Sequence, residues 1–128
     1  MCGICGYVNT DKRPVADDRV LGLMMDSIIH RGPDDHGKYI KDNVALGHRR
    51  LSIIDLESGH QPMIDEKAGL AIVYNGEVYN FLELKTELLN KGHTFTTHSD
   101  TEVVLKAYKE WGADCLDRFN GKIGRAHV

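Results

Sequence analysis

Two strand-like segments, Gly37–Ile40 and Val44–Asp55, follow each other with only three residues between them, and this spacing constrains the fold most. So short a connection joins antiparallel neighbours, because parallel strands need a crossover of a dozen or more residues. Strand-like runs also occur at Met1–Val8, Leu70–Tyr74 and, briefly, Thr94–Thr97. Strands and helical patterns do not alternate regularly along the chain. We therefore predict an α+β fold, with helices packed on antiparallel sheets.

Three segments have the apolar spacing of an amphipathic helix. Their apolar positions, helix by helix, are Leu21, Met24, Met25 and Ile28; Phe81, Leu84 and Leu88; and Val104, Ala107, Tyr108 and Trp111. Asp17 or Asp18 can cap the first helix, and Asn80 the second. Ser99 and Glu102 have the spacing of a capping box at the start of the third.

Composition excludes several classes of protein. The chain has 128 residues, of which 41% are hydrophobic and 27% charged, and this suits one compact domain. Its 16 Lys and Arg residues are scattered and outnumbered by 19 Asp and Glu residues, so we expect no nucleic-acid partner. No apolar run reaches the length of a membrane span, so we expect no membrane partner, and no secretory signal is visible. Three cysteines form no disulfide framework, which favours the reducing cytoplasm.

Cys2 has a chemical option that depends on its position. Removal of Met1 would free its α-amine, whose pKa of about 7.7–8 lets it accept the thiol proton near neutral pH. One residue would then supply both nucleophile and base. Two other interpretations stay open from the residues alone: a small buried cysteine in a first strand, and a C-x-x-C metal or redox pair formed with Cys5.

Other polar residues complement free glutamine, which carries a carboxylate, an ammonium and an amide. Arg50 could bind the carboxylate in a bidentate fork, or be a solvated strand arginine. Asp100, in a predicted first helical turn, could hold the ammonium or serve the helix start alone. Asn75 and the N–H of Gly76 could stabilise an oxyanion, although Asn-Gly between two strand-like runs is also a signal for a hairpin turn.

Six motifs in unbroken order resemble the glutaminase domain of glutamine-hydrolysing asparagine synthetase, a class II glutamine amidotransferase. They are the opening Met-Cys-Gly-Ile-Cys-Gly, His30–Asp34, Arg50–Asp55, Gln61-Pro62, Asn75–Asn80 and Ser99–Glu102. The resemblance covers about residues 1–121 and implies an N-terminal nucleophile hydrolase fold, with two stacked antiparallel sheets flanked by helices. That fold would be incomplete at the C-terminus of this chain.

The resemblance also implies catalytic roles. Cys2 would attack the amide carbon of glutamine and form a γ-glutamyl thioester, while its α-amine carries the proton. Asn75 and Gly76 would form the oxyanion hole. The products would be glutamate and ammonia.

Substrate binding is implied in the same way. Arg50 would hold the carboxylate of glutamine, Glu77 and Asp100 its amino end, and Arg31 would support the wall around Cys2. We expect no metal or cofactor in this chain. ATP and Mg²⁺ would act in a synthetase domain that converts aspartate to asparagine and is absent here. That domain is the expected partner, and a homodimer is compatible with the resemblance.

We therefore expect a partial glutamine amidotransferase type 2 domain at residues 2–121, followed by a non-native tail at 122–128. Residues Ile123–Val128 can be read as codons that match a common sequencing-library adapter. Three alternatives remain: the glutaminase part of another class II amidotransferase, a degenerate domain that binds without turnover, and a small C-x-x-C metal or redox domain.

Overall fold

The computed structural model describes residues 2–15, 17–51 and 59–123. The chain forms two compact units: residues 1–62 with 73–75, and residues 63–72 with 76–128. Both combine helices with antiparallel strand pairs, which confirms the α+β class.

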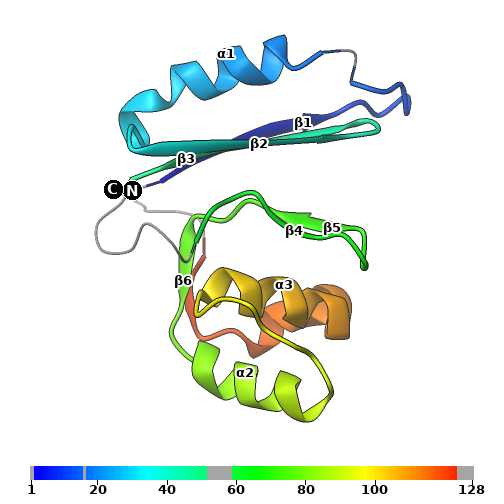
Figure 1. Cartoon of the computed structure of the whole chain (residues 1–128), viewed down its shortest axis with the longest axis vertical. Coiled ribbons are helices and arrows are strands. Elements are labelled where there is room, and N and C mark those ends of the chain that lie inside the picture. The colour runs from blue at the N-terminus through cyan, green and yellow to red at the C-terminus, as the bar shows by residue number, and fades with distance from the viewer. Residues whose placement is uncertain (1, 16, 52–58, 124–128) are drawn as a thin grey trace. The chain divides into compact units, whose positions relative to one another are not determined.

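The first unit is a three-stranded sheet with one α-helix packed on it (Figure 1). Strand β3 (Val44–Arg50) lies in the middle and pairs antiparallel with β1 (Gly3–Val8) and β2 (Asp35–Lys41). The predicted hairpin is therefore confirmed. The part of the predicted strand at residues 52–58 lies outside the described residues.

Helix α1 (Arg19–Ser27) buries the predicted apolar side of its sequence against this sheet. Leu21 and Met25 form a core with Ala45 of β3, all at most 1% exposed. Gly47 lets the helix come close, since a Cβ there would lie 2.8 Å from Met25 Cγ. Each of the two large side chains contributes about 2–3 kcal/mol through burial. The helix continues into a short 3-10 segment, η1 (Ile29–Arg31), which leads to the start of β2.

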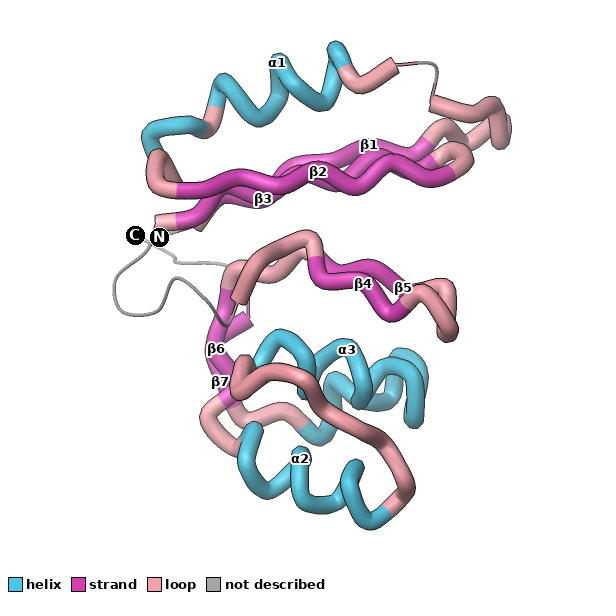
Figure 2. Tube along the Cα trace, in the orientation of Figure 1, coloured by secondary structure: helices cyan, strands magenta, loops and turns pink. Residues whose placement is uncertain are grey.

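The second unit consists of two strand pairs and two helices (Figure 2). Its elements are β4 (Met63–Asp65), β5 (Leu70–Ile72), β6 (Gly76–Val78), α2 (Phe81–Asn90), α3 (Asp100–Trp111), the 3-10 segment η2 (Gly112–Arg118) and β7 (Gly121–Ile123). Strand β4 pairs with β5, and β6 pairs with β7. The buried side chains shared by the two helices and their surroundings are Val78, Leu84, Leu88, Val103, Leu105, Ala107 and Cys115.

The start of α3 differs from the predicted capping box. Ser99 caps the helix and accepts a hydrogen bond from Thr101 N at 3.0 Å, but the Glu102 side chain does not return to Ser99. Its carboxylate accepts hydrogen bonds from the main-chain N–H groups of Thr96 and Thr97 and from both hydroxyls. Burial raises the pKa of Glu102, but these hydrogen bonds outweigh it and the net pKa lies below 4.5.

The strand predicted at Thr94–Thr97 is wrong for the same reason. The N–H groups of Thr96 and Thr97 are bound to the Glu102 carboxylate, so they are not available to a neighbouring strand. Asn80 likewise precedes α2 without capping it. Its side chain instead donates to Arg118 O at 2.9 Å and accepts from Asn120 N at 2.9 Å.

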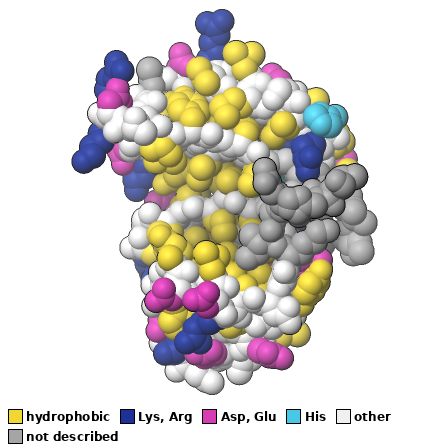
Figure 3. All heavy atoms as spheres, turned by 180° about the vertical axis from the view of Figure 1, so that it is seen from behind, with side chains coloured by type: hydrophobic (Ala, Val, Ile, Leu, Met, Phe, Trp, Pro, Cys, Tyr) yellow, Lys and Arg dark blue, Asp and Glu magenta, His cyan; other side chains and the backbone are white. Residues whose placement is uncertain are grey.

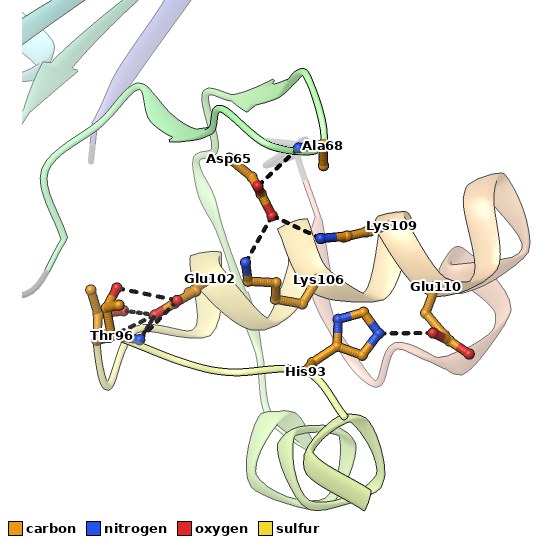
Figure 4. A network of polar contacts seen from close by, with 9 residues as sticks. Asp65, Ala68, His93, Thr96, Glu102, Lys106, Lys109 and Glu110 are labelled. Carbon is orange, nitrogen blue, oxygen red and sulfur yellow. Dashed lines mark hydrogen bonds and ion pairs between the residues drawn. The ribbon is translucent and has the colours of Figure 1, made fainter. Parts of the chain in front are cut away.

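Ion pairs join the β4–β5 pair to α3 (Figure 4). The carboxylate of Asp65, only 8% exposed, contacts Lys106 Nζ at 2.8 Å and Lys109 Nζ at 3.4 Å. It also accepts from Ala68 N at 3.1 Å. The hydrogen bond from Lys106 is the largest cause that lowers the pKa of Asp65 from 3.8 to about 2.

We expect Asp65→Asn to reduce the free energy of unfolding by about 1 kcal/mol at pH 7. Because the folded-state pKa is the lower one, this stabilisation is complete above pH of about 4 and disappears as the pH falls towards about 2. Urea denaturation of both proteins at pH 7, 5 and 3 measures the difference. A difference that stays constant over this range would show that the Asp65 charge is not its source.

Among the described residues, no helix combines the length and the apolar character needed to cross a bilayer. Acidic and basic side chains are interspersed on the face drawn in Figure 3. Such a mixture produces no large region of positive or negative electrostatic potential on that face.

Candidate active site

Three of the predicted motifs meet at one end of the first unit's sheet. Strand β1 begins beside the end of β3, where Gly3 pairs with Arg49. Strand β2 begins there too, where Asp35 pairs with Arg50. Antiparallel pairing therefore brings the segments around Cys2, Arg31 and Arg50 together, although 48 positions separate the first from the last.

Gly32 makes this arrangement sterically possible. A Cβ at this position would lie 2.5 Å from Arg49 O and 2.5 Å from Arg50 N, closer than real Cβ atoms approach main chain. Asp34 N then donates to Arg50 O at 3.0 Å. The main chain of His30–Asp34 therefore packs directly on the last residues of β3.

Cys2 lies at this end of the sheet and is partly buried. Arg31 Nε donates to Cys2 O at 3.3 Å, so the arginine contacts the main chain of the predicted nucleophile. The Cys2 thiol makes a long contact of 4.0 Å with Leu51 O. Such a weak contact leaves the sulfur available for chemistry.

Cys5 has a different environment from Cys2. It packs against the core formed by Leu21, Met25 and Ala45. Burial raises the pKa of the Cys5 thiol, and the nearby Arg49 charge opposes this only in part. A raised pKa disfavours the reactive thiolate. Both cysteines are free, and among the described residues no group of three or more His, Cys, Asp or Glu side chains could hold a metal ion.

Arg50 is the last residue of β3 and is partly buried. Its guanidinium lies against Gly59, where a Cβ would be 3.3 Å from one terminal nitrogen. Asp35 is its neighbour in register. Burial raises the pKa of Asp35, but hydrogen bonds from His60 and from the His36 main chain, with smaller effects of the His60 and Arg50 charges, lower it further, so the net shift is downward.

The hairpin-turn interpretation of Asn75-Gly76 is wrong. Strand β5 ends at Ile72 and pairs with β4, whereas β6 begins at Gly76 and pairs with β7. Neither residue has the positive φ that a type I′ turn requires. The Asn-Gly pair instead lies where the chain passes from the first unit, which includes Asn75, to the second, which begins again at Gly76.

The second unit contains a pocket of about 460 Å³ at the start of β6 and of α3. Its lining consists of Gly76, Glu77, Val78, Tyr79, Phe81, His98, Ser99 and Asp100. It therefore gathers three of the predicted site residues. Asp100 Oδ2 accepts from Val78 N at 3.0 Å, which holds the carboxylate beside β6. Within the described part of the chain, Oδ1 of Asp100 has no hydrogen-bond partner, and Glu77 is exposed.

The predicted site residues are thus distributed over both units. Cys2, Arg31, Arg50 and Asn75 belong to the first, and Gly76, Glu77 and Asp100 belong to the second. Each unit alone already brings several of them together.

Two buried polar residues were given no role from the sequence. Gln61 is 8% exposed and accepts a hydrogen bond from Tyr74 N at 2.5 Å. His48 is 2% exposed and interacts with the main chain of Tyr74. Gln61 stands inside one of the six motifs and His48 does not, but the partner, Tyr74, lies more than ten residues away in each case. The spacing of residues along the local sequence therefore did not predict either contact.

Comparison with known proteins agrees with these motifs. The sequence matches the family described as glutamine amidotransferase domain over residues 1–124. The chain belongs to this family. The match extends beyond the boundary expected at residue 121. Strand β7 also includes residues 122 and 123, whereas 124–128 lie outside the described residues, so the origin of the tail stays a prediction.

Several curated proteins are similar in sequence to this amidotransferase domain. Glutamine-hydrolysing asparagine synthetase 3 of Bacillus subtilis is 44% identical over 123 residues, covering 94% of this chain and 20% of that protein. Glutamine-hydrolysing asparagine synthetase 1 of Arabidopsis thaliana is 40% identical, with 94% and 20% covered. Amidase chry2 of Gibberella zeae is 38% identical, with 95% and 20% covered. The chain thus spans about a fifth of the length of these curated relatives.

Proposed function

We propose that this domain hydrolyses the side-chain amide of glutamine, with Cys2 as nucleophile. The observation that carries the proposal is the meeting of the Cys2, Arg31 and Arg50 segments at one end of a sheet, in a member of the glutamine amidotransferase family. A partly buried cysteine with arginines on the neighbouring segments suits a small substrate that carries a carboxylate. The pocket around Glu77 and Asp100 supports a second, acidic subsite.

The proposed reaction has two steps. After Met1 has been removed, the α-amine of Cys2 takes the thiol proton, and the sulfur attacks the amide carbon. The C–N bond breaks, and nitrogen leaves as ammonia with the proton returned by the amine. Water then attacks the thioester, the C–S bond breaks, and glutamate leaves with the thiol restored. In both steps, the Asn75 amide and the Gly76 N–H would donate to the oxyanion.

The proposed binding roles follow the charges of glutamine. Arg50 would hold the α-carboxylate, because a guanidinium matches it in a bidentate fork. Glu77 and Asp100 would hold the ammonium, and Asp100 has one carboxylate oxygen left for it in the described part of the chain. Arg31 would keep the Cys2 main chain in place.

The remaining proposals concern the fold and the whole protein. We propose the N-terminal nucleophile hydrolase fold, in which antiparallel sheets stack. The full-length protein would then pass ammonia to a synthetase domain that uses ATP and Mg²⁺ to convert aspartate to asparagine. A cytoplasmic location agrees with three free cysteines, and a homodimer stays a prediction. The similarity to Amidase chry2 favours one alternative, another ammonia acceptor joined to the same glutaminase part.

Substrate analogues test the binding roles separately. Ammonia release by the full-length protein is compared for glutamine, for glutamine α-amide, which lacks the carboxylate, and for N-acetylglutamine, which lacks the ammonium. We expect the wild type to prefer glutamine over each analogue by about 100-fold in kcat/KM, or roughly 2–3 kcal/mol. Arg50→Met should remove only the preference over the α-amide, and Asp100→Asn should weaken only the preference over the acetylated analogue.

Two results would contradict the proposal. If none of the three compounds released ammonia, the result would contradict the function itself. Equal loss of both preferences in each variant would contradict the assignment of Arg50 and Asp100 to opposite ends of glutamine. The acceptor is tested by adding ATP, Mg²⁺ and aspartate: asparagine should form in step with glutamate.

A further inference from the structure

We propose that Gln61 is a positioning residue, which holds the Tyr74 peptide and thereby fixes the Asn75 side chain for the oxyanion. The inference rests on the proposed role of Asn75. It assigns a task to the Gln61-Pro62 motif, which the proposed mechanism does not use. All three residues belong to the first unit, so their contacts lie within one compact body.

Among the described strands, none pairs with the segment that carries Asn75. Strand β5 ends at Ile72 and β6 begins at Gly76, so residues 73–75 lie outside both strand pairs. A buried main-chain N–H needs a partner from elsewhere. The Gln61 side chain supplies it, since Oε1 accepts from Tyr74 N at 2.5 Å.

Gln61 is itself held firmly. Its side chain is 8% exposed, and its main-chain carbonyl lies directly over Gly37 of β2. A Cβ at Gly37 would overlap that carbonyl and would also come within 2.8 Å of Pro62 Cδ. The glycine thus lets Gln61 and Pro62 lie flat on the sheet. The sheet thereby sets the position of the Gln61 amide.

His48, on the middle strand of the sheet, interacts with the main chain of the same residue, Tyr74. It is 2% exposed and pairs with Gly37 in register. Burial lowers the pKa of His48, and a hydrogen-bonding interaction with the Tyr74 main chain opposes this shift. Two buried side chains, those of Gln61 and His48, therefore contact the main chain of the residue that precedes Asn75.

An oxyanion donor is effective only when its geometry is fixed before the reaction. Removing one such donor costs about 100- to 1000-fold in kcat, and misplacement by about 1 Å can cost as much as 100-fold. Asn75 has no regular secondary structure to hold it. The hydrogen bond from Tyr74 N to Gln61 provides that constraint one residue away.

The test is a double-mutant cycle in the full-length protein. Gln61→Met has a similar volume but no amide oxygen, so we expect kcat for glutamine hydrolysis to fall about tenfold with KM within about twofold. In the background of Asn75→Ala, the same substitution should lower kcat less than about twofold, because the group that it positions is gone. Gln61→Glu keeps an acceptor oxygen and should stay within about threefold of the wild type.

Two further measurements separate positioning from general loss of structure. Amide exchange of Tyr74, followed by NMR or mass spectrometry, should speed up about tenfold or more in Gln61→Met but not in Gln61→Glu. Asp65→Asn serves as the matched control, because it also removes a largely buried polar contact, here in the second unit, and should leave kcat unchanged.

The outcomes are distinct. Full activity of Gln61→Met beside an impaired Asn75→Ala would overturn the role of Gln61 alone. Independent, multiplicative losses would also overturn it, since they would show a structural effect that does not pass through Asn75. Wild-type kcat in Asn75→Ala would refute the proposed oxyanion donor, and with it the inference that rests on it.

Discussion

Cys2→Ala is expected to reduce glutamine hydrolysis by at least about 10⁴-fold, because the variant retains the α-amine but has no sulfur to form the thioester. Glutamine binding should survive, since the charged groups proposed to hold the substrate are unchanged. Glutamate release under saturating glutamine measures the loss. Isothermal titration with glutamine tests whether binding remains.

Cys5→Ala is the matched control for this prediction. The two thiols are three residues apart, but Cys5 packs against Leu21, Met25 and Ala45 and has a raised pKa. We expect a stability loss of about 1 kcal/mol from the small cavity, with kcat within about threefold of the wild type. A Cys5 variant as inactive as the Cys2 variant would instead favour a function of the C-x-x-C pair.

Asn75→Ala is expected to lower kcat by about 100- to 1000-fold, or roughly 2.7–4 kcal/mol of transition-state stabilisation. KM should change little, because the donor acts on charge that develops only during the reaction. Steady-state kinetics with glutamine over a range of concentrations separates the two parameters. A rise in KM with unchanged kcat would show that Asn75 binds the substrate and does not stabilise the oxyanion.

The parts of the fold that depend on local spacing could be predicted. Leu21 and Met25 recur with the helical period, and this alone identifies the side of α1 that faces the sheet. The β2–β3 hairpin follows from a connection too short for any other pairing. Neither inference needs knowledge of distant segments.

The predictions that were wrong concern segments whose partners lie far away in the chain. Asn75-Gly76 has the local chemistry of a turn, but β6 pairs with β7, more than 40 residues downstream. Glu102 has the spacing of a capping box, but the Thr96 and Thr97 N–H groups compete successfully for its carboxylate. In both cases tertiary contacts override a correct local preference.

The candidate site shows the same division. Chemistry identified residues suited to the charges of glutamine, such as Arg50 and Asp100, whereas only the sheet register shows that the Arg50 and Cys2 segments meet. The support from Gln61 could not be predicted, because a buried amide and its main-chain partner leave no periodic pattern. Functional residues on loops are therefore easier to nominate from sequence than the residues that hold them.

The central claim is that Cys2 becomes a catalyst only as the N-terminal residue. In the most direct measurement, full-length protein that retains Met1 is treated with methionine aminopeptidase. Intact mass follows the removal of Met1, and glutamate release from glutamine is measured in the same samples. We expect negligible hydrolysis before treatment and an activity that rises in proportion to the fraction of free Cys2. Hydrolysis at the full rate with Met1 still in place would contradict it.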